Sequence, residues 1–161
     1  MKYFLISIVK EKGDFYEDDI CKFQKQSYCP SHSKMSATLI EGKCHCGLVK
    51  YKLNAPKQFE FFCHCQDCRV LNGGGHLSGA IFDKSTLIID GGPTKYSYPG
   101  GSGKNIDSYF CPVCGTSLYA FPLAHPGLVV LRANSMKDDK IFTPQKSIFP
   151  ESAFKWDNGV I

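Results

Sequence analysis

Apolar and polar residues alternate along this chain in short runs between residues 38 and 131. The run 49–53 is the clearest, since Val49, Tyr51 and Leu53 are separated by lysines, as in a strand with one buried and one exposed face. The other apolar runs are four to six residues long, which is the usual length of a β-strand. The predicted strands are 38–43, 48–53, 59–63, 77–82, 86–89, 94–98, 106–110, 117–120 and 128–131.

Glycine and proline separate these runs and break regular structure between them, most clearly at 73–75, 91–93 and 99–101. No segment shows a long 3.6-residue apolar period, so the best places for a short helix are the turn after Cys65 and residues 135–140. The composition agrees, with 15 Gly, 9 Pro, 12 Phe and 8 Tyr in 161 residues. The sequence therefore predicts a mainly β single domain with few short helices.

Residues 1–34 differ from the rest of the chain, with mixed charges and two isolated cysteines, Cys21 and Cys29. We expect a poorly ordered N-terminal extension there, followed by one domain over 35–161. The apolar run at 1–9 is short and lacks a cleavage site of the signal-peptide type. Since no stretch has the length of a membrane span either, we expect a cytoplasmic protein in a reducing compartment, with no membrane partner.

The formal net charge of +4 comes from 19 Lys and Arg without a long basic run, so no nucleic-acid partner is predicted. The nine cysteines are an odd number and most are closely spaced, which suits metal thiolates better than disulfides. Seven thiolates and two zinc ions would bring the net charge to about +1. The chemistry of the chain is therefore expected to depend on bound metal.

Seven of the cysteines lie in three clusters, at 42–47, 63–69 and 110–115. A structural zinc takes four thiolates in a tetrahedron, commonly two from each of two segments. The C-x-x-C-G turn of the last cluster is one half of such a site, because the glycine relieves backbone crowding. The C-x-C of the first cluster can supply the other half. The predicted ligands of this structural zinc are Cys44, Cys46, Cys111 and Cys114.

The remaining C-x-C-x-x-C brings three thiols together, those of Cys63, Cys65 and Cys68. Three thiolates leave one tetrahedral position free, which distinguishes a catalytic zinc from a structural one. We therefore expect a second, reactive zinc here and two Zn²⁺ per chain. Spacing alone also allows Cys63 and Cys65 to combine with Cys111 and Cys114, and iron is the main competing metal.

Several other side chains near the clusters are candidates for supporting roles. His45 and His64 stand between cysteines, and the middle residue of an extended C-x-C faces away from its neighbours, so we do not expect either to bind the metal that its neighbours hold. His76 follows a glycine run and is a candidate ligand or proton carrier for the reactive site. Arg69 could offset thiolate charge or bind a substrate carboxylate. The single tryptophan, Trp156, is expected in the core.

Three motifs together resemble the glutathione-dependent formaldehyde-activating enzyme family, which also contains centromere protein V. They are G-x-C-x-C-G-x-V-x-Y at 42–51, C-H-C-x-x-C-R at 63–69 and F-C-x-x-C-G-T at 110–116. The resemblance covers about residues 38–158. It implies a folded β-sheet tent with one zinc on the four cysteines listed above and a second zinc on the other three.

The resemblance also implies an activity, in which glutathione and formaldehyde are joined to S-hydroxymethylglutathione by a carbon–sulfur lyase. We therefore predict a zinc-dependent enzyme of this kind, with glutathione as its small-molecule partner. The chain departs from the family at 70–76, which would border the open zinc, so its own thiol and aldehyde are not predicted. The alternatives are a zinc scaffold that binds a protein or chromatin without turnover and, more weakly, a redox or zinc-buffering thiol protein.

Overall fold

The protein is described by a computed structural model, which covers residues 37–138 and 141–157. The predicted extension at 1–34, with Cys21 and Cys29, lies outside these described residues. Among the described helices, none is long and apolar enough to cross a membrane.

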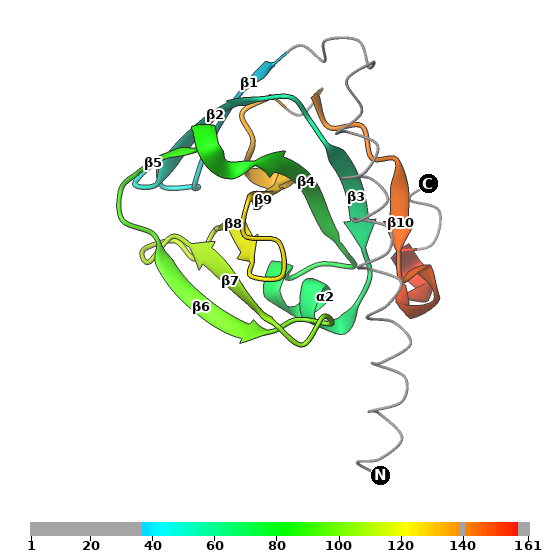
Figure 1. Cartoon of the computed structure of the whole chain (residues 1–161). Helices are drawn as coiled ribbons and strands as arrows, with labels where there is room; N and C mark the ends of the chain where they lie inside the picture. Colours follow the sequence, from blue (N-terminus) through cyan, green and yellow to red (C-terminus); the bar gives the residue numbers. More distant parts are fainter. Residues whose placement is uncertain (1–36, 139–140, 158–161) are drawn as a thin grey trace, which may run out of the picture.

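In the described residues, ten strands form two sheets (Figure 1). The smaller sheet is antiparallel and has the order β1-β2-β5, with β1 at Thr38–Lys43, β2 at Lys50–Ala55 and β5 at Ile88–Asp90. The larger sheet has the order β10-β3-β4-β9-β8-β7-β6 and is antiparallel except where β10 pairs with β3. Its strands are β3 (Phe59–Cys63), β4 (Leu77–Asp83), β6 (Thr94–Pro99), β7 (Asn105–Phe110), β8 (Ser117–Pro122), β9 (Leu128–Arg132) and β10 (Lys146–Ile148).

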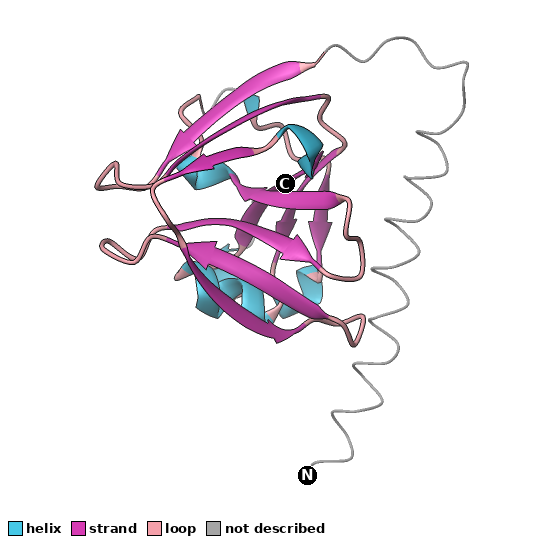
Figure 2. Cartoon of the chain, turned by 60° about the vertical axis from the view of Figure 1, so that its left-hand side comes forward, coloured by secondary structure: helices cyan, strands magenta, loops and turns pink. Residues whose placement is uncertain are grey.

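One short α-helix, α2 at Gln66–Asn72, is present in the described part of the chain. It lies within the curve that the larger sheet makes from β3 round to β6 (Figure 1). The other helical pieces are 3-10 turns of three residues at Lys84–Thr86, Ala133–Ser135, Pro150–Ser152 and Lys155–Asp157. Figure 2 shows that strands dominate the described part of the molecule and that the helical pieces are short. The expected fold class, mainly β with few short helices, is confirmed.

Strand β9 separates two hydrophobic cores because all five of its residues are buried. Val129 and Leu131 face a core that also contains residues of β1 and β2, so this core joins the two sheets. Leu128 and Val130 face a second core, which lies against β3, β4 and β10. Each core also includes cysteines, Cys44 and Cys111 in the first and Cys63 in the second, so both cysteine groups are anchored in a core.

The alternation of apolar and polar residues located most strands to within two residues of their ends. The predicted strand 48–53 begins later, at Lys50, because residues 45–49 form a turn and bend. The strand predicted at 86–89 is displaced, since Lys84–Thr86 is a 3-10 turn and β5 follows it. The helix expected at 135–140 is wrong over its described residues, because Met136 instead bridges Gly42 of β1.

Strand β10 was not predicted, because it is three residues long and depends on pairing with β3. The segment before it is held by Glu60, a carboxylate that is only 1% exposed. One carboxylate oxygen accepts hydrogen bonds from the Thr143 backbone N–H at 2.9 Å and its hydroxyl at 3.0 Å, and Lys57 Nζ lies 3.2 Å away. This anchor brings the C-terminal segment alongside β3, where the second cysteine cluster begins.

Candidate functional site

The turn after β1 and the turn after β7 bring four cysteines together. Cys44 Sγ lies 3.5 Å from Cys46 Sγ, and Cys46 Sγ lies 3.7 Å from Cys111 Sγ. A tetrahedral zinc with Zn–S bonds of 2.3 Å would hold its sulfurs about 3.8 Å apart. The group of Cys44, Cys46, Cys111 and Cys114 therefore fits a zinc ion as it stands.

Both turns have the local geometry that a cysteine pair needs around a metal. Gly47 and Gly115 follow the two pairs with φ of 81° and 71°, a left-handed conformation that side chains rarely adopt. The Val49 backbone N–H donates to Cys44 Sγ at 3.2 Å. The Thr116 hydroxyl lies 3.2 Å from Cys114 Sγ and, with nearby backbone N–H groups, lowers the pKa of Cys114 to about 5. Donors aimed at sulfur thus favour the thiolate, which is the form that binds metal.

The second group is built at the junction of β3 and α2. Cys63 ends β3, Cys65 is the N-cap of α2 and accepts a 3.5 Å hydrogen bond from the Cys68 backbone N–H, and Cys68 lies in the first turn. The three sulfurs lie within 4.8 Å of one another and pack against the second core. Within 37–138 and 141–157, no fourth Cys, His, Asp or Glu joins this group.

Without a cation, these three thiols cannot all ionise. The thiols of Cys63 and Cys68 lower the pKa of Cys65 to about 3, whereas that same proximity raises the pKa of Cys63 to about 12 and that of Cys68 well above its ordinary value. A divalent ion would remove this conflict, because it favours all three thiolates at once. The donor set of three sulfurs fits a thiolate-preferring metal such as zinc.

The two groups are separate, and the structure does not mix them. The alternative in which Cys63 and Cys65 combine with Cys111 and Cys114 does not match the way the sulfurs gather. The four-cysteine group belongs to the core that joins the two sheets, and the three-cysteine group belongs to the core on the other face of β9.

Tyr98 and Arg132 lie on strands that surround α2, and sequence reasoning did not identify either. Burial first, and then the charge at Cys68, raises the pKa of Tyr98. Arg132 is 2% exposed and donates to the hydroxyls of Ser117 and Ser108 at 3.3 and 3.4 Å. No carboxylate of the described chain lies within 4.0 Å of it, so its positive charge is available to offset thiolate charge.

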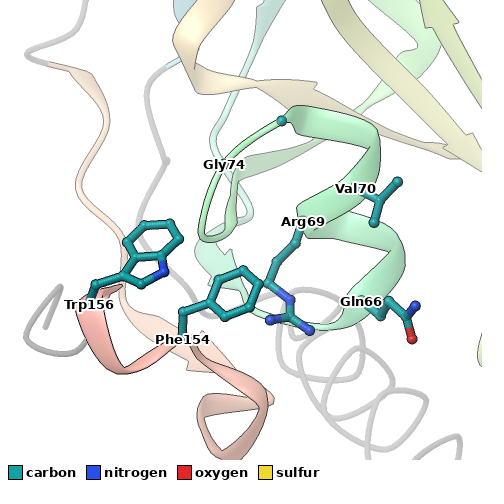
Figure 3. Close-up of a pocket in the computed structure, with 7 residues that line it drawn as sticks. Gln66, Arg69, Val70, Gly74, Phe154 and Trp156 are labelled. Atoms are coloured by element: carbon teal, nitrogen blue, oxygen red, sulfur yellow. The ribbon is translucent and has the colours of Figure 1, made fainter.

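Arg69 lies on the outer side of α2, where a pocket of about 380 Å³ opens (Figure 3). Its guanidinium carbon lies 4.0 Å from the centre of the Phe154 ring, and that ring stacks on Trp156 with the centroids 5.1 Å apart. Trp156 is 71% exposed, so its expected core position is wrong: it packs on a neighbouring aromatic ring at the surface instead of under a sheet. The pocket is lined by Gln66, Arg69, Val70, Gly73, Gly74, Phe154 and Trp156.

The three histidines close to the clusters in sequence lie outside both cysteine groups. His45 is exposed, and its expected non-ligand role agrees with the grouping of the sulfurs. His64 is 3% exposed and faces a different set of residues from Cys63 and Cys65. His76, a candidate for the reactive site, instead contacts Asp157 and His64. Asp157 was not identified from the sequence, because nothing in the spacing of 64, 76 and 157 relates them.

Comparison with known proteins identifies the family. The model for the family described as glutathione-dependent formaldehyde-activating enzyme matches residues 39–152, which is most of the chain and includes all seven clustered cysteines. The chain belongs to this family. A Halomonas elongata protein that carries the provisional name glutathione-dependent formaldehyde-activating enzyme is 32% identical over 116 residues, covering 67% of this chain and 72% of its own length.

A solved structure agrees with the fold of this family member. The crystal structure of a Rhodobacter sphaeroides protein superposes with a TM-score of 0.53 at 19% identity, over 66% of this chain and 98% of that protein. At that identity the likeness shows the fold alone.

Proposed function

We propose that this protein is a zinc-dependent carbon–sulfur lyase-like enzyme that joins glutathione and formaldehyde to S-hydroxymethylglutathione and also catalyses the reverse. The family name indicates both substrates. The observation that carries the proposal is the group of Cys63, Cys65 and Cys68, which offers three sulfurs and, in the described residues, no fourth protein donor. Such a set leaves a position for a substrate atom. We propose a cytoplasmic location, as the thiol chemistry suggests.

The two cysteine groups would each hold one zinc with a different role. Cys44, Cys46, Cys111 and Cys114 would complete a closed site that supports the fold. Cys63, Cys65 and Cys68 would hold the reactive ion, which when bound lowers the pKa of a substrate thiol below its free value of about 8.5. Iron, the competing metal, is less well suited because the reaction needs no electron transfer.

The reaction moves one proton, and we propose the Tyr98 hydroxyl as the group that supplies it. A carbon–sulfur bond forms, the π bond of the formaldehyde carbonyl opens, the thiol loses its proton and the former carbonyl oxygen gains one. A tyrosine hydroxyl is protonated at neutral pH, and burial first, then charge at Cys68, raises the pKa of Tyr98 further, so this side chain carries a proton that it can donate in a hydrogen bond to the carbonyl oxygen. The buried Arg132 would offset the negative charge that develops around the sulfurs.

The pocket on the outer side of α2 is suited to part of the thiol substrate. Arg69 is fixed by stacking on Phe154, and its Nε is buried with no hydrogen-bond partner among the described residues. A buried unpaired donor of this kind favours a carboxylate ligand, and glutathione has two carboxylates. The pocket begins on the helix that carries Cys68, so one glutathione could contact both.

The test is the rate of S-hydroxymethylglutathione formation, measured by NMR exchange spectroscopy on the zinc-loaded protein. We expect wild type to exceed the uncatalysed exchange rate, Cys65→Ser to abolish the excess, and Tyr98→Phe to lower it about 10²-fold or more. Glutathione affinity is measured in parallel by calorimetry. Exchange no faster than in buffer would reject the lyase proposal, and the further absence of glutathione binding would favour the non-catalytic scaffold.

A further inference from the structure

Three donor side chains outside the cysteine groups converge on one point. His76 Nδ1 lies 2.8 Å from Asp157 Oδ2, and His64 Nδ1 lies 3.2 Å from the same oxygen. All three donor atoms lie within 4.8 Å of one another. His64 and Asp157 are buried at 3% and 9% exposure, and His76 is partly open to solvent. An ion could therefore reach this point past His76.

Three separate local features of the fold bring these residues together. The backbone N–H of His64 donates to Ile148 of β10 at 2.9 Å, which fixes the residue between two cysteines. Gly75 precedes His76, and a Cβ at that position would stand 2.4 Å from Asp157 Cγ. Asp157 ends the last 3-10 turn, with its N–H bonded to Phe154. A glycine is thus required for the carboxylate to approach.

Hydrogen bonding explains only part of this arrangement. His76 Nδ1 makes a hydrogen bond with Asp157, but His64 Nδ1 is buried and has no hydrogen-bond partner among the described residues. Its 3.2 Å approach to Asp157 is outside hydrogen-bond geometry. When two ligand atoms share one ion, the lone pair of each points at the ion and not at the other ligand atom. With metal–ligand bonds of about 2.1 Å and the two ligand atoms 3.2 Å apart, the line that joins these atoms makes an angle of about 40° with each lone pair. Off-axis contacts of about 3 Å are expected around a metal.

The charge of the cluster leads to the same conclusion. Within 37–138 and 141–157, the Asp157 carboxylate has no Lys or Arg partner within 4.0 Å, and its only ion-pair partners are the two histidines. A buried carboxylate that lacks a cation is unfavourable. A divalent ion would provide the missing positive charge and would also bind the unpartnered nitrogen of His64.

We propose that His64, His76 and Asp157 form a third metal site, which takes a divalent transition ion, zinc first among them. Two imidazoles and one carboxylate are a donor set for zinc or iron(II), whereas Mg²⁺ and Ca²⁺ prefer all-oxygen sites. This site is distinct from the cysteine groups and does not depend on the proposed lyase reaction.

An ion at this site would connect the end of β3 to the C-terminal segment. Asp157 directly follows Trp156, which with Phe154 forms the aromatic wall of the pocket, next to Arg69. The chain contains one tryptophan, so intrinsic tryptophan fluorescence reports on this wall alone. Metal binding should therefore change the fluorescence of Trp156.

The first test is metal content after equilibrium dialysis of the full chain against micromolar Zn²⁺, measured by mass spectrometry of the metal. We expect wild type to hold one ion more per chain than His76→Asn or Asp157→Asn, whatever the cysteine groups contain. His45→Asn is the matched control, because His45 is the middle residue of the other Cys-His-Cys and lies outside the cluster. It should retain the wild-type content.

The second test follows Trp156 fluorescence while Zn²⁺ is added to the dialysed apoprotein, with Co²⁺ absorption as a check on folding. We expect a saturable change in wild type and His45→Asn that both cluster variants lose, while thiolate-to-Co²⁺ absorption is retained. If both variants keep that absorption and match wild type in metal content, the proposal is overturned and the cluster is a hydrogen-bond network. If one variant fails to fold, the other decides.

Discussion

The four-cysteine group should stabilise the fold more than the three-cysteine group does. Cys46 and Cys111 are 65 residues apart in sequence but have sulfurs 3.7 Å apart, so a shared ion would close a long loop. Cys63, Cys65 and Cys68 lie within six residues, and an ion there restrains little of the unfolded chain. Treated as a cross-link, the 65-residue loop between Cys46 and Cys111 contributes about 4 kcal/mol to the free energy of unfolding.

The double variant Cys46→Ser, Cys114→Ser isolates the contribution of the four-cysteine group to the free energy of unfolding. It removes the two sulfurs that are not fully buried and keeps Cys44 and Cys111, both 0% exposed, in the core. One sulfur remains in each turn, which is too few to hold zinc tightly. At 2–4 °C per kcal/mol for a chain of this size, we expect the midpoint of thermal unfolding to fall by about 8–16 °C.

Thermal unfolding followed by circular dichroism, together with zinc content, measures the effect. The matched control is Cys65→Ser, Cys68→Ser, which also removes two sulfurs and should lose the proposed activity with a shift about half as large, because a six-residue loop contributes only about 2 kcal/mol. A chelator should lower the midpoint of wild type and leave that of the first double variant nearly unchanged. The reasoning is refuted if the control variant unfolds at as low a temperature as the Cys46, Cys114 variant, or if the latter matches wild type.

Three further predictions concern single residues. Gly42→Ala should destabilise the protein by about 1–3 kcal/mol in urea unfolding, because a Cβ there would stand 2.1 Å from the Tyr51 ring; a normal urea midpoint would contradict this. The pKa of Glu41 is lowered from 4.5, first by its hydrogen bond with Lys52. The ionised carboxylate therefore stabilises the fold fully above pH 4.5, and this contribution is lost as the pH falls from there through the lower pKa of the folded state. The stability difference between wild type and Glu41→Gln should accordingly shrink on acidification, and a constant difference would exclude this pairing. Arg69→Gln should raise KM for glutathione more than it lowers kcat, and an unchanged KM would remove Arg69 from the substrate pocket.

The sequence located the strands and the cysteine groups because both are encoded locally. Period-two alternation defined β2, and glycines next to C-x-C and C-x-x-C marked the turns around the first group. The membership of the groups also depended on resemblance to a family, since spacing left a mixed combination open. The helix after Cys65 was expected, and in the structure the Cys65 sulfur caps its N-terminus by accepting a hydrogen bond from the Cys68 N–H.

The rest of the site could not be predicted, because it depends on contacts between distant segments. Strand β10 is held by pairing with β3, and Asp157 reaches His76 only because Gly75 permits it. In the sequence, Arg132 resembles an ordinary residue at the end of a strand, but in the fold its neighbours bury it. Trp156 was misplaced because aromatic character alone does not distinguish a core ring from one stacked at the surface.

The two cysteine groups lie on opposite faces of the same sheet, so the two roles that we propose for them, support of the fold and chemistry, are separated in space. The four-cysteine group lies in the core that joins both sheets, so its loss should release β1 and β2 from the rest of the molecule. The three-cysteine group lies on the face shared with α2, β10 and the C-terminal segment, and α2 and β10 contact the large sheet less extensively than its central strands contact one another. Because elements with few contacts open at low free-energy cost, we expect the proposed substrate to enter on that face while the opposite core remains closed.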